Sequence, residues 1–117
     1  MPLASENCVN PKRGGPGASA ETITELSRQV PDWEIVDHDS MPHLRRAFDF
    51  ADFGSAMSFA AGLGVEADAQ DHHPKITVEW GSALVEWWTH ATGGLHRNDF
   101  IMAARADRLV SAHQVRS

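Results

Sequence analysis

Two candidate β-strands, at residues 75–80 and 83–89, constrain the fold of this chain more than any other feature, because only Gly81 and Ser82 separate them. A two-residue loop that begins with glycine favours a type II′ turn, which joins antiparallel strands and fixes their register. That register places one set of apolar residues on a single face, which we expect to pack beneath helices: Ile76, Val78, Trp80, Val85 and Trp87.

The same register brings two histidines together at the open end of the hairpin. It predicts that His73 faces His90, and directly opposed residues have Cβ atoms about 4.5–5.5 Å apart. Trp88 belongs to the same polar face, where its ring could serve as a ligand platform or a subunit contact. Two imidazoles this close to each other are a candidate acid–base site.

Hydrophobic periodicity predicts three helices and two further strands. Ser19 and Asp52 are suitable helix N-caps, and Pro31 and Pro74 mark where the first two helices must end. The order α-β-β-α-β-β-α predicts an α+β fold, with a four-stranded antiparallel sheet and three helices on one of its faces. The expected elements outside the hairpin are helices at residues 19–30, 52–72 and about 97–113, and strands at residues 33–36 and 44–50 joined by a polar segment at 37–43.

Length and composition narrow the classes of function. We expect a flexible N-terminal arm at residues 1–19, which are rich in Pro, Gly, Ser and Asn, followed by a single domain at residues 20–117. A net charge of −6 disfavours binding to nucleic acid or to an anionic membrane. We find no signal peptide and no apolar run of the ~20 residues needed to cross a bilayer, so we expect a cytoplasmic protein. Cys8 is the single cysteine, which excludes an internal disulfide and a cysteine-based zinc site.

A carboxylate precedes the first of the two adjacent histidines, His72 and His73, by one helical turn. Asp68 and His72 are four residues apart, so both can share one face of the last turn of the middle helix. Asp68 would then orient the His72 imidazole and favour its protonated form. His73 would point elsewhere, toward His90. Histidines in different surroundings can divide the roles of proton donor and acceptor near neutral pH.

Structural explanations of the same residues remain open. A His-His-Pro sequence at a helix end can be a C-terminal cap, because histidine complements the helix dipole there. Asp99 follows His96 by three residues, where an acidic side chain caps the N-terminus of the last helix.

A metal site is the sharper alternative, because three histidines and an aspartate could bind zinc in principle. We expect no metal site, since the adjacent His72 and His73 diverge in extended backbone and no His-x-His or His-x-x-x-His pattern is present. We expect the three remaining histidines in loops or at the terminus to be solvated: His38, His43 and His113.

A series of short motifs runs through most of the chain. They are Pro31-Asp32-Trp33, Phe48-x-Phe50-x-x-Phe53, Asp71-His72-His73-Pro74, an aromatic residue at Trp80, Thr89-His90, Gly94-Leu95 and Asp99. Together they resemble the pterin-4a-carbinolamine dehydratase family, especially bacterial members that accompany phenylalanine hydroxylase. The resemblance covers residues 21–109, with Asp68 where many members have Glu and His96 where many have Ser or Thr.

The resemblance implies an enzyme that removes water from 4a-hydroxytetrahydrobiopterin, or a related 4a-hydroxytetrahydropterin, to give the quinonoid dihydropterin. This hydro-lyase reaction regenerates the cofactor of aromatic amino-acid hydroxylases. We expect His72 as general acid with Asp68, His90 as base, and a substrate-binding set of His73, Asp99 and Trp88, although acid and base could be exchanged. We expect no cofactor besides the pterin substrate.

The resemblance also implies a homodimer or homotetramer, with phenylalanine hydroxylase as a further partner. The alternative is a protein-binding transcriptional cofactor, because animal members of the family bind a transcription factor as a dimerisation cofactor. An exposed helix face that carries Met57 could serve such a partner.

Overall fold

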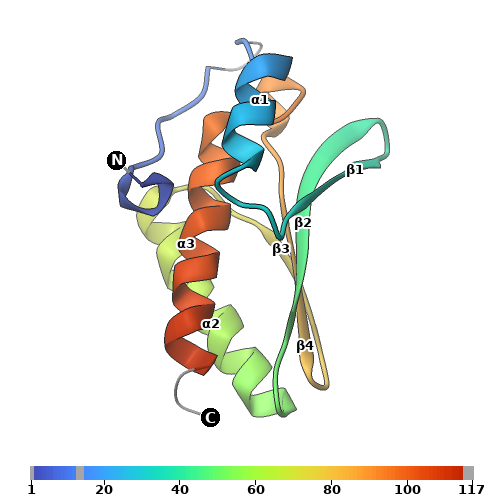
Figure 1. The fold of residues 1–117 in the computed structure, drawn as a ribbon, viewed down its shortest axis with the longest axis vertical. Helices are drawn as coiled ribbons and strands as arrows, with labels where there is room; N and C mark the ends of the chain where they lie inside the picture. The colour runs from blue at the N-terminus through green and yellow to red at the C-terminus, as the bar shows by residue number, and fades with distance from the viewer. Residues whose placement is uncertain (1, 13–14, 115–117) are drawn as a thin grey trace.

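A computed structural model describes residues 2–12 and 15–114, and in this part of the chain it confirms the predicted α+β architecture and element order (Figure 1). The antiparallel sheet has the strand order β1-β2-β4-β3, and the helices lie on one of its faces. None of the described helices is both long and apolar enough to cross a membrane. The elements are η1 (Leu3–Ser5), α1 (Ala20–Ser27), β1 (Glu34–His38), β2 (Met41–Asp49), α2 (Phe53–Gln70), β3 (Lys75–Glu79), β4 (Ser82–Trp87), η2 (His90–Thr92) and α3 (Arg97–Gln114).

The predicted caps set the ends of two helices. Ser19 accepts a hydrogen bond from the Thr22 backbone N–H at 3.2 Å, and Asp52 accepts one from the Ser55 N–H at 2.7 Å. At its other end α2 stops at Gln70, because the next residue, Asp71, takes a left-handed conformation with φ 51°. The segment that carries the two adjacent histidines is therefore outside the helix.

The β3–β4 hairpin differs from the prediction in its turn. Glu79 pairs with Ser82, so the loop is Trp80-Gly81, and the positive φ of 75° falls on the second loop residue instead of the first. The predicted type II′ turn is therefore wrong, and the predicted register is off by two residues. A shift of two keeps each side chain on its face, so Val85 and Trp87 are buried and Ile76 and Val78 are half-buried as part of the predicted inner set, whereas Trp80 is 73% exposed in the turn.

The corrected register also separates the two histidines expected to face each other. Lys75 pairs with Glu86, and continuing this ladder by two residues would put Trp88, not His90, opposite His73. His90 lies instead in the short η2 turn that follows β4.

The β1–β2 hairpin is tighter than expected. Asp39 and Ser40 form its two-residue loop, and both adopt left-handed φ values, 53° and 65°, the combination that defines a type I′ turn. The predicted polar connection at 37–43 is therefore wrong, and most of it extends the two strands. Pro42 has no N–H with which to bond a neighbouring strand. It is tolerated because β2 pairs with β4 only from Leu44 onward, so no β4 residue is paired with Pro42.

The core lies between the helices and the inner face of the sheet (Figure 1). Full burial of a large apolar side chain contributes about 1.5–3 kcal/mol. The largest buried side chains include Trp87, Phe48, Phe59, Phe100, Leu44, Leu63 and Met102. None of the described helices covers the outer face of the sheet (Figure 1).

The N-terminal arm, expected to be flexible, is largely irregular but lies against α2 and α3. Leu3 is buried at 2% exposure. The Cys8 backbone N–H donates to Gln70 on α2 at 2.7 Å, and Val9 exchanges two hydrogen bonds with the Asn98 side chain on α3. Burial raises the pKa of the Cys8 thiol to about 11, so little of the reactive thiolate forms at neutral pH.

Candidate active site

A fully buried carboxylate joins three segments of the chain. Asp99, in the first turn of α3, accepts a hydrogen bond from His72 Nε2–H at 2.7 Å on Oδ1. Its Oδ2 accepts from the Thr89 hydroxyl at 2.8 Å and from the His96 backbone N–H at 2.9 Å. Because an ionised carboxylate has no proton to give, the His72 imidazole must be the donor, and only its Nδ1 is left for another partner.

The expected contact between Asp68 and His72 is wrong. Asp68 Oδ1 instead lies 3.0 Å from His73 Nε2, in a pair whose side chains are 56% (His73) and 81% (Asp68) exposed. The left-handed Asp71 ends the helix before His72, so the four-residue helical spacing no longer puts Asp68 and His72 on one face. His72 turns inward, where its ring stacks 5.7 Å from that of Trp87.

Asp99 also caps α3, as the structural alternative predicted. The His96 Nδ1 accepts a hydrogen bond from the Asn98 backbone N–H at 3.0 Å, while the Asp99 carboxylate accepts one from the His96 backbone N–H at 2.9 Å. Burial lowers the pKa of His96, against an opposing effect of the Asp99 charge and with a smaller contribution from His72. The same carboxylate therefore serves as a cap and as the partner of His72.

His90 borders a hollow on the outer side of the sheet. The hollow has a volume of about 380 Å³, which is large enough for a small ligand. It lies between the β1–β2 turn and the open end of the β3–β4 hairpin. Its lining residues are His38, Asp39, Met41, His43, Lys75, Trp88 and His90.

His43 is not solvated, contrary to expectation. It is 4% exposed, its Nδ1 lies 3.2 Å from Glu86 Oε1, and its ring stacks on Trp88 with centroids 4.0 Å apart and planes 3° from parallel. The sequence does not reveal this burial, because the predicted second strand begins at Leu44 and leaves His43 in the connecting segment. Extending the second strand back to Met41 would have put it opposite Trp88 in the β2–β4 register.

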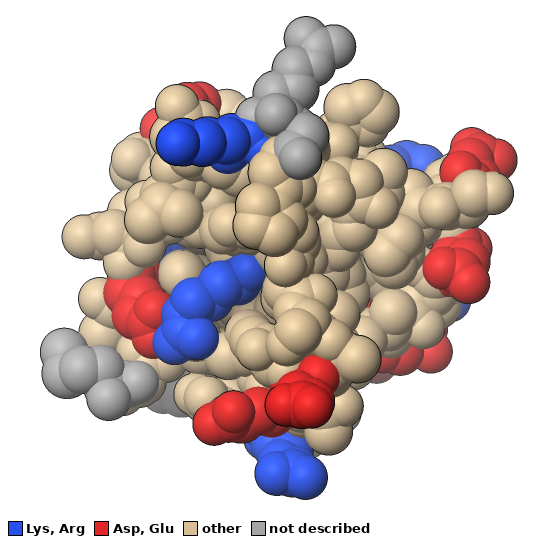
Figure 2. All heavy atoms as spheres, turned by 90° about the horizontal axis from the view of Figure 1, so that it is seen from above, with Lys and Arg blue, Asp and Glu red and all other residues tan. Residues whose placement is uncertain are grey.

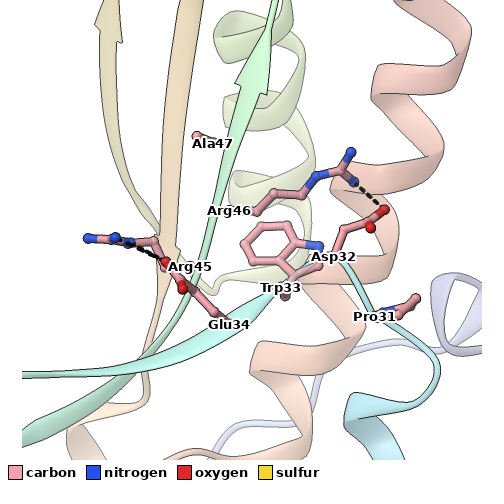
Figure 3. Close-up of a pocket in the computed structure, with 7 residues that line it drawn as sticks. All are labelled: Pro31, Asp32, Trp33, Glu34, Arg45, Arg46 and Ala47. Atoms are coloured by element: carbon pink, nitrogen blue, oxygen red, sulfur yellow. Dashed lines mark hydrogen bonds and ion pairs between the residues drawn. The ribbon is translucent and has the colours of Figure 1, made fainter.

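A second hollow, of about 410 Å³, lies where the chain enters β1 beside β2, and its lining residues, drawn in Figure 3, include no histidine. Its two arginines already have carboxylate partners: Arg45 pairs with Glu34 at 3.0 Å, and Arg46 with Asp107 at 2.6 Å and Asp32 at 3.8 Å. Burial raises the pKa of Asp107, and hydrogen bonds from Trp33 and Arg46 oppose this shift. The hollow beside His90 is therefore the better candidate for a reacting site.

Comparison with known proteins decides the family. The family model described as pterin 4 alpha carbinolamine dehydratase matches residues 16–109, a range that includes all three histidines of the predicted site. The chain belongs to this family.

Members of the pterin-4a-carbinolamine dehydratase family resemble the chain over most of its length. A protein of Chlorobium limicola is 50% identical over 102 residues, 87% of this chain and 90% of the relative. One of Gloeobacter violaceus is 44% identical over 111 residues, 95% of this chain and 96% of the relative. Both carry the description "Putative pterin-4-alpha-carbinolamine dehydratase".

A solved structure supports the same fold for this dehydratase family member. It is described as a transcriptional coactivator/pterin dehydratase from Brucella melitensis, and it superposes with a TM-score of 0.72 at 27% identity. The match covers 80% of this chain and 97% of the Brucella chain.

Charges on the surface are mixed in sign. On the face seen in Figure 2, the Lys and Arg side chains lie beside Asp and Glu side chains and do not gather into a basic patch. Among the side chains that the structure describes, in residues 2–12 and 15–111, no group of three or more His, Cys, Asp or Glu is arranged to hold a metal ion.

Proposed function

We propose that the protein catalyses the dehydration of 4a-hydroxytetrahydropterins, with 4a-hydroxytetrahydrobiopterin as a natural substrate. The observation that carries the proposal is the family match over residues 16–109, which contains the histidine and aspartate motif of the buried network. In the reaction the C4a–O bond breaks and its electron pair leaves with the oxygen, which takes up a proton to become water. N5 loses its proton, and a C4a=N5 double bond forms.

Histidines suit both proton transfers. An imidazole with the ordinary pKa near 6.5 can give or take a proton at neutral pH. We assign proton transfer to His72 and His90 and substrate binding to His73 and Trp88, because the fully buried Asp99 cannot make the substrate contact expected of it. Asp99 takes the orienting role for His72 that was expected of Asp68, because its Oδ1 is the acceptor 2.7 Å from His72 Nε2. Asp68 then orients His73.

The reaction as written needs no metal, redox cofactor or covalent nucleophile. We propose that its product re-enters the pterin cycle of aromatic amino-acid hydroxylation in the cytoplasm, with phenylalanine hydroxylase as the enzyme that supplies the substrate. A homodimer or homotetramer is the proposed assembly, since β1 and β3 leave unpaired edges in the described chain.

A stopped-flow assay of 4a-hydroxytetrahydropterin breakdown tests the proposed activity. The wild-type chain should accelerate breakdown, and His72→Ala and His90→Ala should each lower kcat by about 10²–10⁴-fold, the usual effect of a positioned acid or base. Circular dichroism and urea unfolding check that both variants keep the fold. A wild-type chain that leaves the spontaneous rate unchanged would contradict the proposed function.

The adaptor alternative rests on the Brucella protein, whose description includes transcriptional coactivator. If the chain is an adaptor, a variant that lacks both His72 and His90 should still bind its protein partner stoichiometrically. Loss of all dehydration in that variant, with no partner captured by either form, favours the enzyme.

A further inference from the structure

We propose that His43 and Glu86 act as a positioning pair. Together they hold the Trp88 ring in one orientation, so that it forms a flat wall for the pterin in the hollow beside His90. The inference rests on the proposed function, because it names how that substrate is held. His43 lies outside the motifs that relate this chain to its family.

The first support is the burial of the pair on a face with no helix over it. His43 is 4% exposed and Glu86 is 6% exposed, although both belong to the outer face of the sheet. A buried polar pair stabilises a fold little better than an apolar pair of similar volume, and often less well. Stability alone therefore gives no reason for this pair, whereas a fixed orientation does.

The second support is the geometry of the ring stack. The His43 and Trp88 rings are 4.0 Å apart and within 3° of parallel, and Glu86 fixes the imidazole by accepting from Nδ1–H at 3.2 Å. Trp88 is only partly buried and lines the hollow together with His43 and His90. An indole held in one orientation offers a planar surface to a flat bicyclic ligand at little entropic cost.

The third support is the unused nitrogen of His43. Glu86 accepts from its Nδ1–H, and its Nε2 makes no hydrogen bond to the described residues. A ligand in this hollow thus meets a flat aromatic wall and a nitrogen that can accept or donate a hydrogen bond. A pterin has both complementary features, a planar ring system and an edge of polar N–H and C=O groups.

Substitutions separate the positioning role from catalysis. Trp88→Ala should raise KM for 4a-hydroxytetrahydrobiopterin about tenfold, the usual effect of losing one ring stack on a heterocycle, while Trp88→Phe should restore most of the loss. His43→Asn keeps a donor for Glu86 but removes the ring, and it should raise KM several-fold. In all three variants kcat should stay within about twofold of wild type, whereas His90→Ala lowers kcat.

His43→Phe keeps a ring but leaves Glu86 buried without a partner, so it is combined with Glu86→Leu to preserve folding. This double variant should stack on Trp88 and still raise KM, because the anchor and the free nitrogen are lost. Glu79→Gln, on the same face but exposed, is the matched control and should leave KM unchanged. A folded double variant with the wild-type KM and kcat would overturn the proposal.

Direct binding of 7,8-dihydrobiopterin, measured by titration calorimetry, separates this inference from the proposed activity. If the wild-type chain binds this product analogue but does not accelerate dehydration, the proposed activity fails, and the positioning pair survives only if His43→Asn weakens binding. If dehydration is normal and the variant binds the analogue as tightly as wild type, the pair has no role in positioning and the inference alone fails.

Discussion

His72 and His73 are neighbours in the chain, and each pairs with an aspartate, yet their environments are opposite. The pair of His72 with Asp99 is buried, with side-chain exposures of 10% and 0%, whereas the pair of His73 with Asp68 is 56% and 81% exposed. Extended backbone sends successive side chains to opposite sides, so one imidazole enters the core and the other faces solvent. Both imidazoles have the same type of partner, so burial decides how much each pair contributes to the free energy of unfolding.

The largest effect should come from removing the buried carboxylate. Asp99→Ala leaves His72, Thr89 and His96 without their common acceptor, and we expect it to lower the free energy of unfolding by about 3–5 kcal/mol. Urea denaturation measures this loss. A loss below that of Asp68→Ala would remove the distinction between the two pairs.

A single bond within the buried network should have an intermediate effect. Thr89→Val preserves side-chain shape but removes the hydroxyl that donates to Asp99 Oδ2 at 2.8 Å. Because the acceptor is ionised and buried, we expect a loss of about 1.5–3 kcal/mol in the free energy of unfolding. Thr24→Val, on the exposed face of α1, is the matched control and should change it much less.

The buried end of α3 should also make stability depend on pH. Burial lowers the pKa of His96 in the folded protein below the ordinary value of 6.5 that the unfolded chain retains. The unfolded chain therefore binds more protons below about pH 6.5, so this histidine's contribution to the free energy of unfolding falls as the pH drops from there through the folded pKa.

His96→Ser keeps a capping side chain but cannot titrate in this range. Unfolding at about pH 8 and about pH 5 should show a smaller loss of stability on acidification in the variant than in the wild type. Equal losses in both proteins would mean that folding does not lower the pKa of His96.

The smallest effect should come from the exposed pair. Asp68→Ala should change the free energy of unfolding by no more than about 1 kcal/mol, because solvent screens the interaction with His73. The same variant tests the orienting role proposed for Asp68, through a change in KM measured beside the unfolding curve. A loss comparable to that of Asp99→Ala would show that the exposed pair is coupled to the core.

Much of the fold could be predicted from local patterns. The capping residues Ser19 and Asp52 and the period of each segment placed all three helices within a few residues of their observed bounds. The β3–β4 hairpin was predicted with the correct faces, because a register error of two residues preserves alternation. The turn was not predicted, since a loop that begins with Gly81 satisfies the type II′ rule, whereas in the structure Gly81 ends the loop and takes its positive φ there.

Less of the candidate site could be predicted from local patterns. The chain order showed that His72, His73, His90 and Asp99 are available, but it did not show which carboxylate meets which imidazole. That choice depends on the left-handed Asp71, which breaks the helical spacing, and on the packing of α3 against the end of α2.

The sequence by itself determined the elements, their order and the family, because these follow from periodicity, capping and motifs within short stretches of chain. Only the tertiary structure decided the partners of the histidines and the burial of His43, because these contacts join residues 5 to 43 positions apart. Such contacts depend on the strand register and on the residue at which a helix ends. Either can change by one or two residues at little local cost in free energy. The pairing of side chains, unlike the formation of the elements, is therefore settled by the packing of the whole domain.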